Sequence, residues 1–251
     1  MKKQVLFLSV FVAAIVAVMV SGVSCQKERG PQEPENDKYE RIGQLHNEGL
    51  DFVLDYISDS RTKGGTGLTK DQALAGAMEA VDVFLAKKGV SAAVTKSGTY
   101  RFDDYDGAGL TAAQKEFYDE LIETVTDPFL DYESTQKVVS QIKDRVVATL
   151  PEQEAEALLC GIVVAQYSME YWYDNADKWK AAGDLDALAY QVATKGGNPE
   201  GDDELSWKEL VSSDAGGAVA GALVGALPGA LTGGLAASAG DGVKQLIDKI
   251  L

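Results

Sequence analysis

Five glycines recur at every fourth position near the end of the chain, inside a stretch that carries no charge. The stretch lies between Asp214 and Asp241, and its regularly spaced glycines are Gly217, Gly221, Gly225, Gly229 and Gly233. Positions four apart lie nearly above one another on an α-helix, so these glycines would form one flat face. Such a face lets a second helix backbone approach closely. We therefore expect residues 206–251 to form a glycine-zipper tail whose glycine row is a helix-association surface.

The uncharged part of this tail has the length of a membrane span. Its 26 residues would make a helix about 39 Å long, which is enough to cross a bilayer. Strongly apolar residues are few, however, and the glycines and Pro228 disfavour a lone inserted helix. We expect the 215–239 segment to contact a membrane or a second copy of the chain in a homo-oligomer. The alternatives are that the tail packs against its own domain in water, and that Pro228-Gly229 splits it into a helical hairpin.

The N-terminal residues have the layout of an export signal that ends at a cysteine. Two lysines are followed by an apolar run, by small residues and by Cys25. A charged start, an apolar run and a small-residue cleavage site are typical of a secretory signal. This segment resembles a bacterial lipobox, which implies that residues 1–24 are a lipoprotein signal peptide and that Cys25 carries a lipid. An ordinary signal peptide that is cut near Ser24 is the alternative.

The residues that follow the cysteine indicate a destination. Gln26-Lys27-Glu28 resembles the export tag of surface lipoproteins of Bacteroidota, and the string at 42–50 resembles one in uncharacterised lipoproteins of the same group. These resemblances imply an outer-membrane lipoprotein that the tag would direct toward the cell surface. Residues 25–36 are polar and contain two prolines, so we expect them to form a flexible tether.

Between the tether and the tail, the pattern of apolar residues is helical. Apolar residues recur at spacings of three and four from position 42 onward, as on one face of a helix. Thr69 and Thr111 each open a capping box, Ser134 is expected to cap a later helix, and Gly89 is a stop signal. We predict a mainly α fold, with an antiparallel helical bundle of about five helices and a C-terminal glycine-zipper helix or helical hairpin.

Composition sets the boundaries between the parts and limits the partners. The bundle is expected at 37–190, and residues 191–205 form an acidic, glycine-rich linker before the 206–251 tail. The chain has 23 basic and 39 acidic residues and a formal net charge of −16. Such a surface repels nucleic acid and anionic lipid headgroups. Contact with a membrane must therefore come from the lipid on Cys25 or from the 215–239 segment.

The residue types that usually carry chemistry are scarce. His46 is the only histidine, and there is no Gly-x-Ser-x-Gly motif, so we expect His46 to pair with a nearby acid or backbone group and expect no catalytic residue. Cys160 lies in an apolar run, which is typical of a small buried residue. The acidic loop at 103–110 has Ala113 where a calcium loop needs its last glutamate. We therefore predict no metal site and no cofactor, and we expect most aromatic residues at 167–179 to belong to the core.

These observations favour a non-enzymatic, lipid-anchored protein of the cell envelope. Its tail would associate with other helices in a membrane or in an assembly. The tail also resembles glycine-zipper segments in bacterial envelope lipoproteins and in small pore-forming bacteriocins, so a bacteriocin-like, membrane-active antagonist is the alternative. A carbohydrate-binding lipoprotein is a third and weaker interpretation, which depends on the aromatic residues at 167–179.

Overall fold

The computed structural model describes residues 37–64, 70–90, 105–183 and 207–250. Within these ranges the chain forms only helices, which confirms the mainly α class. The helices are α2 (Asp37–Gly64), α3 (Lys70–Lys87), α4 (Ala112–Thr126), α5 (Tyr132–Thr149), α6 (Glu152–Gly183) and α8 (Trp207–Ile250). The predicted signal peptide at 1–24, the tether at 25–36, the predicted cap Thr69 and the linker at 191–205 lie outside the described residues.

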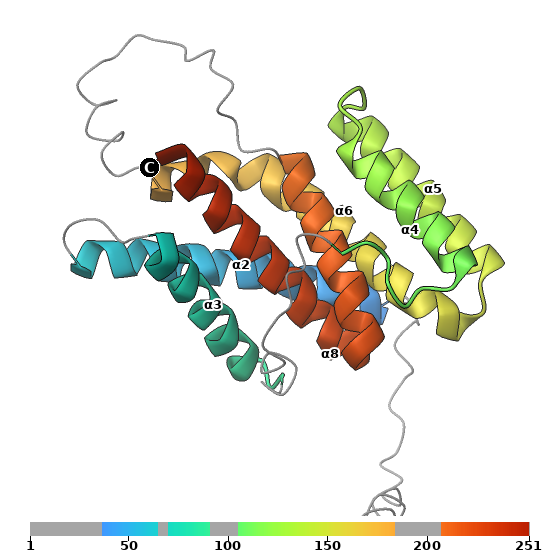
Figure 1. The fold of residues 1–251 in the computed structure, drawn as a ribbon, viewed down its shortest axis with the longest axis horizontal. Coiled ribbons are helices and arrows are strands. Elements are labelled where there is room, and N and C mark those ends of the chain that lie inside the picture. Colours follow the sequence, from blue (N-terminus) through green and yellow to red (C-terminus); the bar gives the residue numbers. More distant parts are fainter. Residues whose placement is uncertain (1–36, 65–69, 91–104, 184–206, 251) are drawn as a thin grey trace, which may run out of the picture. The chain divides into compact units, whose positions relative to one another are not determined.

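The long helix α6 lies at the centre of the packing. Its most extensive contact is with α8, and α5 and α4 also pack against it. Figure 1 shows α4 and α5 running side by side, as the short connection between them requires. Buried apolar residues from all six of these helices join in one hydrophobic core. The helices therefore bury their apolar faces against one another, as the three-four periodicity predicted.

Local sequence signals set several helix ends. Thr111 caps α4, because its side chain accepts a hydrogen bond from the Gln114 backbone while the Gln114 side chain accepts one from the Thr111 backbone. Gly89 follows α3 with a φ of 75°, a left-handed conformation that glycine adopts without strain. The start of α5 differs from the prediction. Asp131 is the cap, and its carboxylate accepts from the backbone N–H of Ser134 at 2.8 Å.

The C-terminal helix α8 is a hairpin of two arms. Its backbone leaves the helical conformation at Gly225 (φ −137°, ψ 20°) and at Ala226 (φ 51°, ψ −141°). We call residues 207–224 the first arm and residues 227–250 the second arm; both are visible side by side in Figure 1. The break lies just ahead of the Pro228-Gly229 pair where the sequence suggested a turn. Pro228 thus falls in the first turn of the second arm, where its missing N–H breaks no helical hydrogen bond.

The hairpin belongs to the same compact unit as the other helices, since that unit runs from Lys38 to Leu251. It contacts α6, α3 and α4. Core residues of the first arm include Leu210, Ala215 and Val219, and Leu231 and Leu235 are buried on the second arm. Of the alternatives for the tail, the structure therefore has the one in which it packs against its own domain as a hairpin.

Candidate functional site

The glycine row closes on itself along the hairpin. Gly217 lies against Gly233, and Gly221 lies against Gly229, so the two arms meet backbone to backbone. A methyl group on Gly217 would lie 2.5 Å from the Gly233 carbonyl oxygen, and the Gly221–Gly229 approach is closer still. Only glycine fits at these four positions. We call them the glycine seam. Gly225, the fifth predicted association residue, lies at the turn and not in the seam.

The seam changes what the glycine row can do. In this conformation the four seam glycines are occupied by one another, so they present no groove to a second copy of the chain. A homo-oligomer that used the row would first have to open the hairpin. The row is therefore a helix-association surface whose observed partner is the other arm of the same chain.

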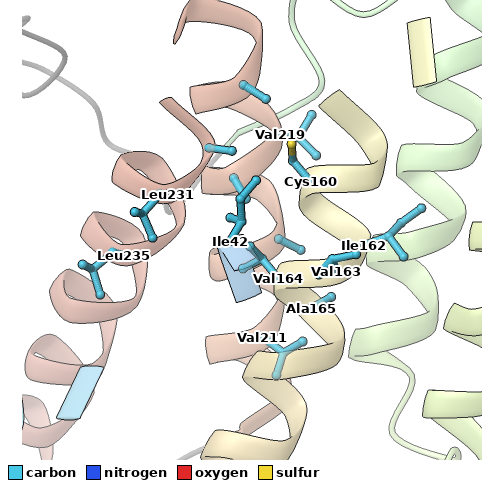
Figure 2. Close-up of a cluster of buried hydrophobic side chains, with 14 of the residues drawn as sticks. Ile42, Cys160, Ile162, Val163, Val164, Ala165, Val211, Val219, Leu231 and Leu235 are labelled. Atoms are coloured by element: carbon cyan, nitrogen blue, oxygen red, sulfur yellow. The ribbon is translucent and has the colours of Figure 1, made fainter. Parts of the chain in front are cut away.

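Helix α6 also approaches the hairpin through a glycine. A methyl group on Gly161 would lie 3.0 Å from the Ala215 carbonyl oxygen and would overlap the Val219 side chain. Figure 2 shows Val219 of the first arm beside Cys160 of α6, and both belong to the buried apolar cluster. Gly161 lies outside the four-residue repeat, so the sequence pattern did not mark it. The close approach explains why the contact between α6 and α8 is so extensive.

A buried polar cluster lies among the apolar residues and joins α2, α6 and both arms. We call it the Asp214 cluster, and it consists of His46, Ser168, Trp172, Asp214 and Ser238. His46, Ser168 and Asp214 are fully buried. Asp214 Oδ2 accepts hydrogen bonds from the Ser168 hydroxyl and, at 3.1 Å, from Trp172 Nε1. His46 Nε2 lies 3.6 Å from the same carboxylate oxygen, so α2 contributes the imidazole ring that faces an aspartate which the first arm brings into the core.

Burial governs the electrostatics of this cluster. Removal from water raises the pKa of Asp214, and the opposing influences are the nearby His46 and the hydrogen bonds from Ser168 and Trp172. Among the described residues, His46 Nε2, Asp214 Oδ1 and Ser238 Oγ are buried without a well-formed hydrogen bond, although the proximity of Ser238 also lowers the pKa of Asp214. The other ring nitrogen of His46, Nδ1, lies 3.1 Å from the side-chain oxygen of Asn47. The Asn47 amide in turn donates to the Tyr167 carbonyl of α6 at 2.9 Å.

The cluster fixes the open end of the hairpin, and its side chains are buried. His46 pairs with an acid as we predicted, but that acid comes from another helix and no local sequence pattern marks it. A second link crosses between the arms in the same region, where the Ser213 hydroxyl donates to the Asp241 carboxylate. Because His46 and Asp214 are sealed from solvent, they cannot act as base or acid on an external ligand without the hairpin moving.

Aromatic residues of α6 pack over the same end of the hairpin. Trp172 lies 3.1 Å from the position that a methyl group on Gly242 would take, and its ring centroid is 5.1 Å from that of Trp179. Trp179 Nε1 donates to the Tyr171 hydroxyl at 3.0 Å. Both tryptophans and Tyr171 are buried, as predicted for core residues, whereas Tyr173 is exposed. The two indole rings therefore offer no open stacking surface for a sugar.

The turn of the hairpin is an exposed apolar surface. We call residues 223–228 the hairpin tip; Leu223 and Val224 have 40% and 62% of their surface exposed, and Ala226 and Pro228 are exposed as well. No charged residue occurs in the tip. Within the described part of the chain, the stretch from Trp207 to Lys244 is long and apolar enough to cross a membrane by length and composition, and most of its apolar window is buried. Core helices of water-soluble proteins meet the same criterion.

The other predicted sites fall as follows. Cys25 lies outside the described residues. Cys160 is buried, and removal from water raises the pKa of its thiol to about 12. In the described part of the acidic loop, the Asp106 carboxylate accepts a hydrogen bond from the Ala108 backbone at 3.0 Å.

Comparison with protein families, with curated proteins and with solved structures finds no match for this chain.

Proposed function

We propose that this chain is a non-enzymatic, lipid-anchored protein of the cell envelope, and that the α8 hairpin is its helix-association element at the membrane. The observation that carries the proposal is the glycine seam inside the uncharged stretch of the hairpin at 215–240. Backbone-to-backbone packing of small residues depends on close contact and not on the exclusion of water. A hairpin that is held this way stays paired in lipid as well as in water.

The burial of the reactive side chains supports a role without catalysis. His46 and Cys160 are the residues of this chain best suited to act as a base and a nucleophile, and both are fully buried. The raised pKa of Cys160 also keeps its thiol protonated near neutral pH. Localisation to the outer membrane rests on the lipobox-like segment and on the residues after Cys25.

A bacteriocin-like antagonist is the second candidate, and one observation favours it. The apolar outer faces of both arms are covered by other helices of the same unit, so the hairpin is stored in a form compatible with water. In an antagonist, the covering helices would release the hairpin at a target membrane. In an anchored envelope protein, the bundle would stay closed.

Fatty-acid labelling tests the anchor. A bacterial host is grown with a labelled fatty acid, and wild type is compared with Cys25→Ser and with Cys160→Ala, which removes the other cysteine. We expect label in wild type and in Cys160→Ala and none in Cys25→Ser. Label that persists in Cys25→Ser would refute lipidation at that residue.

Dye release separates the two candidates. The purified full chain is added to sealed lipid vesicles loaded with a self-quenched dye. The anchored protein is expected to bind without releasing dye, because its hairpin remains paired and buried. Rapid release at low protein-to-lipid ratio would favour the antagonist and contradict the proposed role.

A further inference from the structure

The start of α2 and the hairpin tip lie at the same end of the helices. The first arm runs antiparallel to α6, because Asp214 meets Ser168 while the later residue Val219 meets the earlier Gly161. Continuing the arm toward its tip therefore leads to the first turns of α6. The start of α2 also lies beside the first turn of α6, since Lys38 Nζ lies 3.8 Å from Glu152 Oε1. Figure 1 shows both segments at this end.

This placement fixes where the tether joins the folded unit. Residues 26–36 connect Cys25 to the start of α2, and eleven extended residues span at most about 40 Å. A lipid on Cys25 would thus hold the end that carries the tip within that distance of a bilayer. The opposite end carries Phe129, which is 94% exposed. Phe129 lies between Asp127 and Leu130, and the carbonyl groups of both accept hydrogen bonds from Lys208 at the start of the first arm. Phe129 therefore lies near the open end of the hairpin.

The geometry points to the hairpin tip as a membrane-docking surface, which enters the near leaflet of the bilayer that holds the Cys25 lipid. The inference rests on the proposed lipid anchoring and adds the surface that makes contact. Leu223 and Val224 offer exposed apolar side chains without a neighbouring charge in the tip. A chain with a net charge of −16 gains nothing from anionic headgroups. Docking is therefore apolar, and we expect it on phosphatidylcholine, whose zwitterionic headgroup has no net charge.

The length of the arms limits how far the hairpin can enter. From Asp214 to the turn at Gly225 the first arm has ten uncharged residues, or about 15 Å of helix. The hydrocarbon core of a bilayer is about 30 Å thick, so these residues reach only its midplane. Asp214 on the first arm and Asp241 on the second arm mark the ends of the uncharged stretch. Beyond the tip both arms are buried against α6, α3 and α4, so only the tip enters while the bundle stays closed, whereas a straightened α8 would be long enough to span.

The test places a polarity-sensitive fluorophore at the tip. The lipidated full chain carries Cys160→Ala and Val224→Cys, is labelled at the new thiol, and is reconstituted on phosphatidylcholine vesicles. We expect the emission to shift to the blue and to be quenched by lipids with a quencher on the acyl chain. The control is Phe129→Cys in the same background, because it labels a more exposed apolar position at the opposite end. Its emission should remain that of a dye in water.

The outcomes separate the docking from the anchoring. Flotation of the protein with the vesicles reports the anchor. A protein that floats with a water-like signal at Val224, or with the same signal at Phe129, would overturn tip docking and leave the anchor intact. A lipidated protein that does not float would contradict the proposed function and the docking together. Amide hydrogen exchange of the unlabelled protein provides a second measurement, with slowed exchange expected at 223–228 and unchanged exchange around Phe129.

Discussion

Replacing one seam glycine by alanine is the most direct test of the hairpin. In Gly217→Ala, the added methyl group would lie 2.5 Å from the Gly233 carbonyl oxygen and 2.8 Å from the Ala237 Cβ. Ordinary van der Waals contact of a Cβ atom begins at 3.4 Å, so the arms must separate by about 0.9 Å to relieve the contact with the carbonyl oxygen. The nearest atom belongs to the backbone of the other arm, which cannot turn aside as a side chain can. We expect the whole seam to loosen.

The size of the effect follows from two opposing contributions. Overpacking in a closely packed core costs typically about 1–3 kcal/mol, and a gap of 0.5–1 Å forfeits about a quarter to a half of each dispersion contact along the seam. Alanine is a better helix former than glycine, and this difference stabilises the folded variant by up to about 1 kcal/mol. Taking the upper end of the cost, we expect Gly217→Ala to destabilise the protein by about 2 kcal/mol. The midpoint of thermal unfolding should then fall by about 4–8 °C.

The control is the same substitution at Gly240, farther along the second arm. Nothing lies within 4 Å of a methyl group at Gly240, so only the helix propensity changes, and Gly240→Ala should raise the midpoint by about 2–4 °C. Urea unfolding followed by circular dichroism gives the same comparison through the denaturation midpoint. A Gly217→Ala variant that unfolds at or above the wild-type midpoint would refute the close seam.

Three further predictions concern single residues. Ala226 has a φ of 51°, so Ala226→Gly should relieve strain and stabilise the protein by about 1 kcal/mol, measured by urea unfolding. Burial raises the pKa of Asp214 above its ordinary value of 3.8, so its contribution to stability falls as the pH rises through and above about 4. Asp214→Asn keeps an acceptor for Ser168 and Trp172, and its stability should decline less than that of wild type between about pH 4 and pH 7; an equal decline would contradict this origin. The buried Cys160 thiol should resist a maleimide in the native protein and react once the protein is unfolded, because the thiolate is the reactive form.

The helix signals that depend on neighbouring residues were predictable. Thr111 and Gln114 form the capping box that their spacing predicted, and Gly89 ends α3 in the left-handed conformation. The start of α5 was less determined. Asp131 and Ser134 are both good caps three residues apart, and sequence alone does not say which one the chain uses.

The path of the glycine row was not determined by its spacing. A repeat of four gives the same face on one straight helix and on two arms that turn at a repeat position. Whether the chain forms one helix or two arms depends on what packs against the apolar outer faces of the arms. Helix α6 packs there, and Gly161 allows its close approach to the first arm. The Asp214 cluster was hidden for the same reason. His46 and Asp214 come from helices far apart in the sequence, and no local pattern records a contact that only the tertiary fold creates.

The symmetry of the seam restricts how this hairpin can change in evolution. Gly221 and Gly229 lie four residues before and after Gly225, and Gly217 and Gly233 lie eight before and after it. A one-residue insertion between a seam glycine and the turn would rotate that glycine by about 100° and swing it off the seam. A viable length change therefore adds or removes about one turn of helix in both arms together, the interval that keeps glycine facing glycine. Relatives of this protein should differ in hairpin length in multiples of that repeat, and they should not carry single-residue gaps there.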